Sequence, residues 1–206
     1  YHYALKEFTA PTRFVKAYAI DGKTFRLKFN SQGAGEANLL IELGVRAHFI
    51  EYLSEKSEEN HLVKILRRLL ENAVVKNACL LNFDRIIEIE LEKKEKYFLI
   101  IEMLSEGNLV LCDENHKIID CLHSEDYSVR TIRKGRPYAP PPPNGMHPCE
   151  LTPTALEGKK GRVIQLLSKA VNLSPFYLEE ACAIAGVSPK QEASELTESE
   201  VKKIIK

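Results

Sequence analysis

The stretch NFDRIIEIELEKKEKYFLIIEMLSEGNLVLCD, residues 82–113, decides the fold. Residues 86–91 alternate isoleucine or leucine with glutamate, which is typical of a half-exposed β-strand. Residues 97–104 form an apolar run on the other side of the charged break at 92–96, and we expect the two runs to pair as a hairpin. The apolar residues are thereby explained as sheet core. Four residues are not, and they are the first functional candidates: Asp84, Arg85, Gly107 and Asn108.

An aspartate and an arginine stand together where the first of these strands begins. The planar guanidinium of Arg85 carries a fork of donors that suits a phosphate or a carboxylate, and Asp84 is placed to orient it. The same spacing also fits a plain salt bridge or cap at the strand end, because exposed ion pairs are common and contribute little. Both interpretations stay open on spacing alone.

Length and composition indicate a soluble globular protein. A chain of 206 residues with 44% apolar and 28% charged residues can bury one good core, or one large and one small domain. No apolar run approaches the roughly 20 residues needed to span a bilayer, so no membrane is expected as a partner, and no secretory pattern opens the chain. Because Tyr1 replaces an initiator methionine, we expect that a beginning has been removed.

Five cysteines, an odd number without a Cys-x-x-Cys pair, favour reduced thiols and a cytoplasmic location. Cys112, His116, Cys121 and His123 are residue types that can bind zinc. The two cysteines lie inside apolar strands, however, so core cysteine is the better explanation, and we expect neither a metal nor a cofactor.

The formal net charge is zero, but the charges are clustered. Basic clusters on a neutral chain fit a binder with a defined footprint, in which a few phosphate contacts set the affinity and its salt dependence. Lysines and arginines that merely solvate helix faces give the same pattern. The basic clusters are Lys64, Arg67 and Arg68; Arg130, Arg133, Lys134 and Arg136; and Lys159, Lys160 and Arg162.

Turn residues and periodicity predict the order of the elements. Residues 14–20 and 24–30 alternate around Asp21-Gly22, a strong hairpin signal, and residues 38–43 and 46–50 flank Gly44 as two more strands. A helix is expected over 59–73, with Arg67 and Arg68 on its outer face. Further strands extend to about residue 122. The prediction is an α+β fold, with a mainly antiparallel sheet and one inserted helix.

The composition changes after residue 127. Consecutive prolines at 140–143 make a stiff segment, and beyond it the chain is helical. We therefore expect an α+β domain over 1–136, a proline-rich linker over 137–150 and a helical domain over 151–206. In the last, Gly186 lies in a turn that fits either a helix-hairpin-helix unit or a simple glycine C-cap, and Thr197 with Glu200 forms a capping box.

Five motifs in order together resemble the NFACT family, the ribosome quality-control factors that include NEMF and whose bacterial members were called fibronectin-binding protein A. The resemblance is to the N-terminal portion of an archaeal-type member and covers about residues 14–206. It extends to residues 173–182, which are similar to the family's helix-hairpin-helix module. The motifs are Asp84-Arg85-Ile86, Leu99 to Asp113, Leu43-Gly44-Val45-Arg46, the helix with Arg67-Arg68, and Gly135 to Pro141.

The resemblance implies a function and partners. Family members bind the large ribosomal subunit carrying a stalled nascent chain and recruit a tRNA, so that the chain is extended without a template or marked for degradation. It implies that the Asp-Arg motif, matched by Asp84 and Arg85, is needed for tRNA recruitment. It also implies that a coiled coil and a further RNA-binding domain follow Lys206.

The resemblance further implies a fold similar to the N-terminal domain of formamidopyrimidine-DNA glycosylases. Those enzymes need an amino-terminal proline followed by a glutamate, whereas this chain begins Tyr1-His2, so base-excision chemistry is unsupported. Residues 1–12 match the family's opening helix poorly, and no functional residue is carried over from them.

Three function classes follow from these observations. The leading hypothesis is a non-enzymatic RNA-binding adaptor, in which basic residues hold the tRNA backbone and the sheet supplies shape. The alternatives are a protein-interaction or adhesin module that binds fibronectin, and a nucleic-acid-processing enzyme of glycosylase-like fold. The candidate RNA-binding residues are Asp84, Arg85, Arg67, Arg68, Arg46, Asn108, Arg133 and Arg136.

Overall fold

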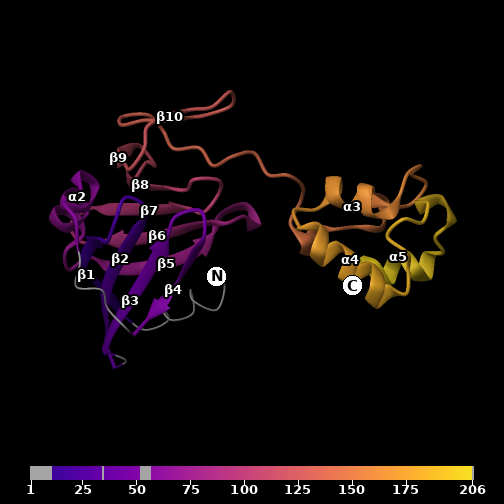
Figure 1. Ribbon diagram of the computed structural model, residues 1–206, viewed down its shortest axis with the longest axis horizontal. Coiled ribbons are helices and arrows are strands. Elements are labelled where there is room, and N and C mark those ends of the chain that lie inside the picture. Colours follow the sequence, from indigo (N-terminus) through magenta and orange to yellow (C-terminus); the bar gives the residue numbers. More distant parts are fainter. Residues whose placement is uncertain (1–10, 34, 52–56, 206) are drawn as a thin grey trace. The chain divides into compact units, whose positions relative to one another are not determined.

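The computed structural model describes residues 11–33, 35–51 and 57–205 (Figure 1). The chain divides into two compact units. The first comprises Tyr1–Leu81 and Arg85–Pro141, and the second comprises Asn82–Asp84 and Pro142–Lys206. The main division therefore falls between the second and third of four consecutive prolines, inside the predicted linker.

A mainly antiparallel sheet forms the first unit. Its nine strands lie in the order β4-β3-β2-β1-β5-β6-β7-β8-β9, so that only β1 and β5 are sheet neighbours without being consecutive in the chain. The strands are β1 (Thr12–Ala19), β2 (Thr24–Ser31), β3 (Gly35–Glu42), β4 (Arg46–Ile50), β5 (Val74–Leu80), β6 (Ile86–Glu92), β7 (Lys96–Glu102), β8 (Asn108–Asp113) and β9 (Ile118–Cys121).

The sheet bends sharply where β1 meets β5. These two strands pair only at Thr12 with Val75 and Arg13 with Val74, and then separate. We call β1–β4 the first half and β5–β9 the second half. In Figure 1 the strands of the first half run obliquely across those of the second. One apolar core, including Phe14, Phe29 and Leu99, fills the space between the halves.

One helix, α2 (His61–Leu70), packs against β1 and contributes to that core. The side chain of Asn60 caps its first turn by accepting a hydrogen bond from the backbone N–H of Val63 at 3.1 Å. Its apolar face buries Leu62, Val63, Ile65, Leu66 and Leu70, each worth roughly 1.5–3 kcal/mol of transfer free energy. The helix is shorter than the predicted 59–73 because Asn72 adopts a left-handed conformation, φ 64°, and turns the chain into β5.

A second apolar cluster covers the outer face of β6, β7 and β8. It joins Ile86, Ile100 and Val110 to Ile132 and Tyr138, which lie in the segment after β9. That segment contains the short hairpin of β10 (Glu125–Asp126) and β11 (Thr131–Ile132). The central strands are therefore buried on both faces, which explains their near-continuous apolar sequence.

A buried ion pair fastens this segment to the sheet. The guanidinium of Arg130 donates two hydrogen bonds to the carboxylate of Glu102, at 2.5 and 2.8 Å, and the hydroxyl of Tyr138 donates a third at 2.8 Å. The side chains of Arg130 and Glu102 are only 7% and 4% exposed. We call this group the Glu102 clasp. Burial, together with the Glu102 carboxylate, raises the pKa of the Tyr138 hydroxyl, which therefore stays a donor.

Two turns between strands meet at one end of the first unit, and we call this end the turn end. The β3–β4 turn at Gly44 lies against the β7–β8 turn at Ser105 and Gly107. Both glycines have φ of +75°, and a Cβ at Gly107 would lie 2.7 Å from the Gly44 nitrogen. The conformation and the close approach both require glycine, so Gly107, one of the residues that the strand pattern left unexplained, has a structural role here.

The second unit is helical, with its own apolar core that includes Leu167, Leu178 and Val201. Its capping box forms as expected: the side chain of Glu200 accepts a hydrogen bond from the backbone N–H of Thr197 at 2.8 Å, and Thr197 Oγ1 accepts one from Glu200 N at 3.3 Å. The helices are α3 (Val163–Ala170), α4 (Pro175–Ala185) and α5 (Glu198–Ile205), with short 3-10 turns at η3 (Pro148–Glu150), η4 (Pro153–Ala155) and η5 (Ala193–Glu195). None of the helices over the described ranges is both long and apolar enough to cross a bilayer.

The Glu102 clasp predicts a large effect of Glu102→Gln. This change leaves the buried guanidinium of Arg130 without its charge partner, and we expect the free energy of unfolding to fall by about 3–5 kcal/mol. Urea denaturation followed by circular dichroism measures it. The matched control is Glu106→Gln, which removes an exposed pair with Lys23 and leaves the midpoint unchanged. Equal losses of unfolding free energy in both variants would show that the Glu102 clasp stabilises the fold no more than an exposed ion pair does.

The turn end gives a second prediction. Gly107→Ala forces a left-handed residue with a side chain into a space already filled by backbone, so we expect a loss of at least about 2 kcal/mol of unfolding free energy. Gly22→Ala is the control, because nothing lies within 4 Å of its Cβ position. Thermal melts of the two variants compare them directly, and a stable Gly107→Ala protein would contradict the close contact of the turns.

Candidate nucleic-acid interface

Arg85 lies exposed immediately before β6, at the turn end of the first unit. Its backbone carbonyl accepts a hydrogen bond from the backbone N–H of Met103 at 2.8 Å, which fixes the position of its Cα beside the β7–β8 turn. Asp84 is half-buried and belongs to the second unit. That the carboxylate of Asp84 orients the guanidinium of Arg85 stays a prediction.

The loop before this pair has an unusual backbone. The short turn η2 (Leu81–Phe83) holds Asn82 and Phe83 both at φ of 52°, a region that residues with side chains rarely adopt. Within the second unit, Asn172 donates its side-chain amide to the carbonyl oxygens of Asn82 and Phe83, at 3.4 and 3.2 Å. Such strain is retained where the surrounding contacts over-determine it, and it often marks a functional position.

Arg46 shares the turn end with Arg85. It opens β4 two residues after Gly44, and Gly44 touches the same β7–β8 turn that follows Met103. Its Nε lies 2.8 Å from Glu42 Oε2 in an exposed pair. Because such a pair contributes little free energy, Arg46 can exchange that carboxylate for a ligand phosphate at small cost.

A hollow of about 470 Å³ opens between the turns at this end. Its charges are mixed, since Lys23 pairs with Glu106 and Arg46 lies beside Glu42. The hollow is therefore not itself an anion site. The lining residues are Asp21, Gly22, Lys23, Thr24, Glu42, Leu43, Gly44, Val45, Ser105 and Glu106.

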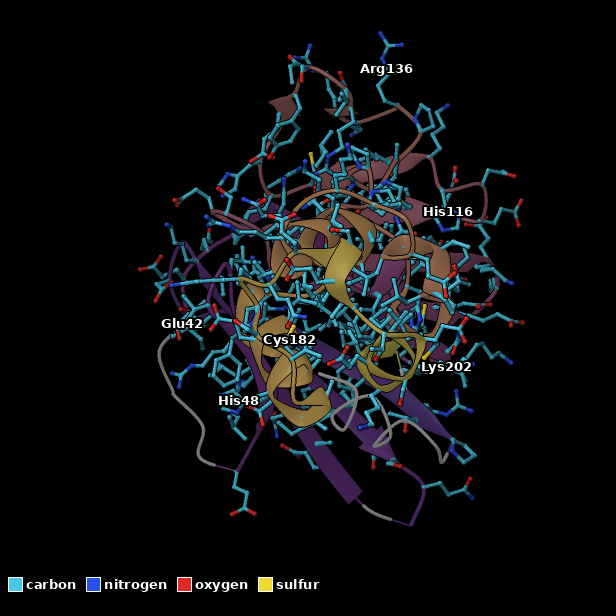
Figure 2. All side chains as sticks on the ribbon, turned by 90° about the vertical axis from the view of Figure 1, so that its right-hand side faces the viewer. Glu42, His48, His116, Arg136, Cys182 and Lys202 are labelled. Atoms are coloured by element: carbon cyan, nitrogen blue, oxygen red, sulfur yellow. The ribbon has the colours of Figure 1, made fainter. Side chains whose placement is uncertain are left out.

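Arg133 and Arg136 line a second shallow hollow, of about 500 Å³, beside the β10–β11 hairpin. Arg133 is exposed and lies 2.5 Å from Asp126, whereas the side chain of Arg136 extends into solvent (Figure 2). Arg130 also lines the hollow, but its guanidinium is committed to Glu102. The buried Arg130 thus fixes the loop that displays the exposed Arg133 and Arg136.

The strand register relates this loop to Arg85. Glu102, which holds Arg130, stands directly opposite Ile86, the neighbour of Arg85 in the chain. Arg85 does not line the hollow of Arg133 and Arg136. The structure therefore places the two groups on adjoining parts of the first unit and does not merge them into one concavity.

Arg67 and Arg68 occupy different environments on α2. Arg67 does not face away from the sheet as expected: its Nε donates a hydrogen bond to the carbonyl oxygen of Ala17 in β1 at 2.7 Å, and its guanidinium lies 5.4 Å from the ring centroid of Tyr18. Arg68 is exposed. Neither residue lines either hollow.

Asn108 has a structural role in this arrangement. It is 1% exposed, and its side-chain amide donates to the carbonyl oxygen of His123 at 2.8 Å and accepts from the His123 N–H at 3.2 Å. These bonds tie the end of β9 back to β8, so the amide is not displayed to a ligand. We therefore remove Asn108 from the candidate RNA contacts.

Several cations near the candidates were missed by sequence reasoning. Lys16 and Arg26 flank Tyr18 on the outer face of the first half. The available signal was the period-2 alternation of β1 and β2, which sends these residues to the face opposite the core. Nothing in that alternation indicates that they gather around one ring together with Arg67.

The chemistry that these groups offer is charge and hydrogen-bond donation. No three His, Cys, Asp or Glu side chains of the described residues gather as a metal site. Cys112 lies buried in the second apolar cluster, and burial raises the pKa of its thiol to about 12, so it stays protonated and unreactive. The exposed arginines are suited to phosphate oxygens.

Comparison with known proteins gives relatives along most of the chain. It is 27% identical over 209 residues to the archaeal Rqc2 homolog aRqcH of Methanocaldococcus jannaschii, covering 93% of this chain and 31% of the relative. It is 26% identical over 211 residues to the ribosome quality control complex subunit NEMF of Mus musculus, covering 94% of this chain and 19% of the relative. The chain thus spans less than a third of the length of either relative.

Solved structures share the fold. The N-terminal part of the fibronectin/fibrinogen-binding protein of Streptococcus suis aligns with a TM-score of 0.79 at 20% identity, covering 98% of this chain and 80% of that one. The N-terminal domain of the fibronectin-binding protein PavA of Streptococcus pneumoniae aligns with a TM-score of 0.74 at 22% identity, covering 88% and 81%. Both confirm the mainly antiparallel sheet with a few helices.

The model of one protein family, described as the NFACT N-terminal and middle domains, matches residues 3–206. That match covers nearly the whole sequence, and it agrees with the order of the motifs and with the relatives. The chain belongs to the NFACT family.

Proposed function

We propose that this chain is an RNA-binding module of ribosome-associated quality control, which contacts tRNA through the exposed arginines of its first unit. Two relatives are named as subunits of the ribosome quality control complex, the mouse protein NEMF, which matches over 94% of the chain, and subunit 2 of Schizosaccharomyces pombe, which matches over 66%. The proposal extends to the large ribosomal subunit with a stalled nascent chain as the platform on which the tRNA is held, and to a cytoplasmic location.

The observation that carries the proposal is the way the Glu102 clasp fixes a basic loop. Arg130 is buried and bound, and this anchors the chain on which Arg133, Lys134 and Arg136 are exposed. Loops lose conformational entropy when they bind, so a loop that is already fixed binds phosphates at a lower entropic cost. Arg85 stands one residue from the strand position that faces Glu102.

Because the chain carries no net charge, phosphate contacts can come only from local clusters of cations, which define the surface covered by the ligand. Arg46 and Arg85 lie at the turn end, whereas Arg133 and Arg136 lie beside the hairpin, so a ligand that reaches both must extend over an edge of the unit. A folded RNA has phosphates spaced over such distances, and it is recognised mostly by shape and backbone. In this proposal the protein positions its ligand and makes or breaks no bond in it.

The second unit supports the same assignment less directly. Its Gly186 has φ of 75° and ends α4 as a glycine C-cap, with its backbone N–H donated to the Ala183 carbonyl and that of Val187 donated to the Cys182 carbonyl. We propose that this unit corresponds to the helix-hairpin-helix module inferred from the sequence and supplies a separate nucleic-acid contact.

Arg85→Ala tests the proposed function. We expect the dissociation constant for tRNA to rise roughly three- to tenfold and the salt dependence to become shallower by about one unit of log–log slope, because one phosphate contact is lost. Fluorescence anisotropy of a labelled tRNA over a range of salt concentrations measures both quantities.

The matched control is Arg13→Ala, since Arg13 is an exposed arginine where β1 begins, at the opposite end of the sheet. The two alternative functions are examined with other ligands. Titration with fibronectin addresses the adhesin module, and a DNA duplex containing a damaged base addresses the nucleic-acid-processing enzyme. Tight fibronectin binding without affinity for RNA, or turnover of the damaged duplex, would contradict the proposal. Equal effects of the two arginine variants would remove Arg85 from the interface.

The basic loop gives a second functional prediction. The double variant Arg133→Gln/Arg136→Gln leaves the Glu102 clasp intact, so we expect an unchanged melting temperature but roughly tenfold or weaker tRNA binding from two lost contacts. The control is Lys93→Gln/Lys94→Gln, which removes the same charge from the exposed turn between β6 and β7. If the control weakens binding as much as the loop variant does, the loss comes from net charge and not from contacts of this loop.

A further inference from the structure

The outer face of the first half carries a group of cations that the proposed interface does not use. Ala17 of β1 and Leu27 of β2 point into the core, so their neighbours Lys16, Tyr18 and Arg26 point outward. The register places Tyr18 directly opposite Arg26. This face lies on the side of the first half opposite to the second half of the sheet.

Three of these cations surround a single aromatic ring. The guanidinium carbon of Arg26 lies 4.0 Å from the ring centroid of Tyr18, and Lys16 Nζ and the guanidinium carbon of Arg67 each lie 5.4 Å from it. A ring face attracts one cation by about 0.5–2 kcal/mol. This attraction to the Tyr18 ring does not offset the mutual repulsion of three cations, so their close placement needs a further explanation.

Carboxylates are missing from the group. Within the described ranges, no Asp or Glu lies in ion-pair distance of Lys16, Arg26 or Arg67, whereas Lys28, opposite Lys16 in the register, lies 2.6 Å from Glu36 Oε2. Arg26 is only 8% exposed, and its Nε has no hydrogen-bond partner among the residues that the structure describes. A buried charge is normally paired, because its desolvation is otherwise uncompensated.

Geometry separates the roles of the three cations. Lys16 is exposed, and Arg67 is half-buried with its Nε held by the Ala17 carbonyl, which directs the guanidinium toward Tyr18. These two are placed to touch a ligand. Arg26 is covered, and it acts on the ligand through its field, which is weakly screened at a buried position.

We propose that Lys16 and Arg67, with Arg26 behind them and Tyr18 between them, form a phosphate-binding position for the backbone of RNA. It rests on the proposed function and deepens it, because it adds a contact on the outer face of the first half, apart from Arg85 and from the β10–β11 loop. The ligand phosphate supplies, within ion-pair distance of these cations, a negative charge that the described residues do not place there.

A polynucleotide fits this position better than a free anion. The cations lie on a sheet face and not in either of the two hollows, so a single small phosphate would be weakly enclosed. A phosphate that belongs to a chain already held elsewhere on the protein binds with a high effective concentration. A half-buried ring beside the phosphates also offers a neighbouring base a surface for stacking.

The test combines two readouts on the same protein. Carbon-13 tyrosine labelling reports the ring resonances of Tyr18, assigned with Tyr18→Phe, while anisotropy reports binding of labelled tRNA. We expect tRNA and a ten-nucleotide uridine oligomer to shift the Tyr18 resonance saturably, with a midpoint that rises with salt. Lys16→Gln and Arg67→Gln should each weaken the midpoint roughly three- to tenfold and reduce the salt slope by about one.

The matched control is Lys28→Gln, on the same face and with the same loss of charge, and it should leave the midpoint unchanged. Binding of tRNA without any change at Tyr18, or equal effects of Lys16→Gln and Lys28→Gln, overturns the inference and leaves the proposed function standing. A polyglutamate peptide that shifts Tyr18 as strongly as the oligomer overturns the assignment to RNA. No anisotropy change with tRNA overturns the proposed function, and with it this site.

Discussion

The ion pair between Glu102 and Arg130 is the constraint on which the candidate interface depends. Glu102 lies in a central strand, and without a partner its carboxylate would carry a large desolvation penalty on the outer face of the sheet. Arg130 and Tyr138 together saturate it. In doing so they bring an otherwise irregular segment against the sheet and complete the second apolar cluster. Arg133 and Arg136 thus owe their positions to a buried charge.

This arrangement divides the basic residues into two kinds. Arg130 makes hydrogen bonds that hold the fold together, at Glu102, whereas Arg67 combines one such bond, to the Ala17 carbonyl, with a guanidinium turned toward Tyr18. Arg85 and Arg136 are exposed, and Arg46 and Arg133 have only exposed partners. A chain with equal numbers of acidic and basic residues can still bind a polyanion in this way, because the cations that matter are oriented and the exposed partners Glu42 and Asp126 can be exchanged for ligand phosphates at small cost.

Much of the fold could be predicted from the sequence, because periodicity and turn residues are local signals. The hairpin at Asp21-Gly22, the strands around residues 92–96 and the capping box at Thr197 formed as expected. Strand β5 was missed because its register shifts between Val75 and Asn77, which breaks the alternation. The two-residue strands β10 and β11 are too short to leave a pattern.

The candidate site was harder to predict, because partners far apart in sequence decide which polar residues are displayed. Asn108 looked functional but bonds to a backbone fifteen positions away, and Arg67 bonds to a carbonyl fifty positions earlier. Neither contact has a local signature. Charge clusters indicated the segment of residues 130–136, yet they did not distinguish the buried Arg130 from the exposed Arg136.

The meeting of β1 with β5 has a consequence for how the chain acquires its structure during synthesis. Strand β1 lies near the centre of the sheet, and its pairing with β5 closes a loop of about sixty residues. Hairpins β1–β4 can form as they emerge, and α2 can then cover part of their apolar inner face, but the rest stays exposed to water until β6–β8 have been translated. Completion of the sheet is therefore a non-local step, and steps of this kind are slow and leave apolar surface exposed while they are pending.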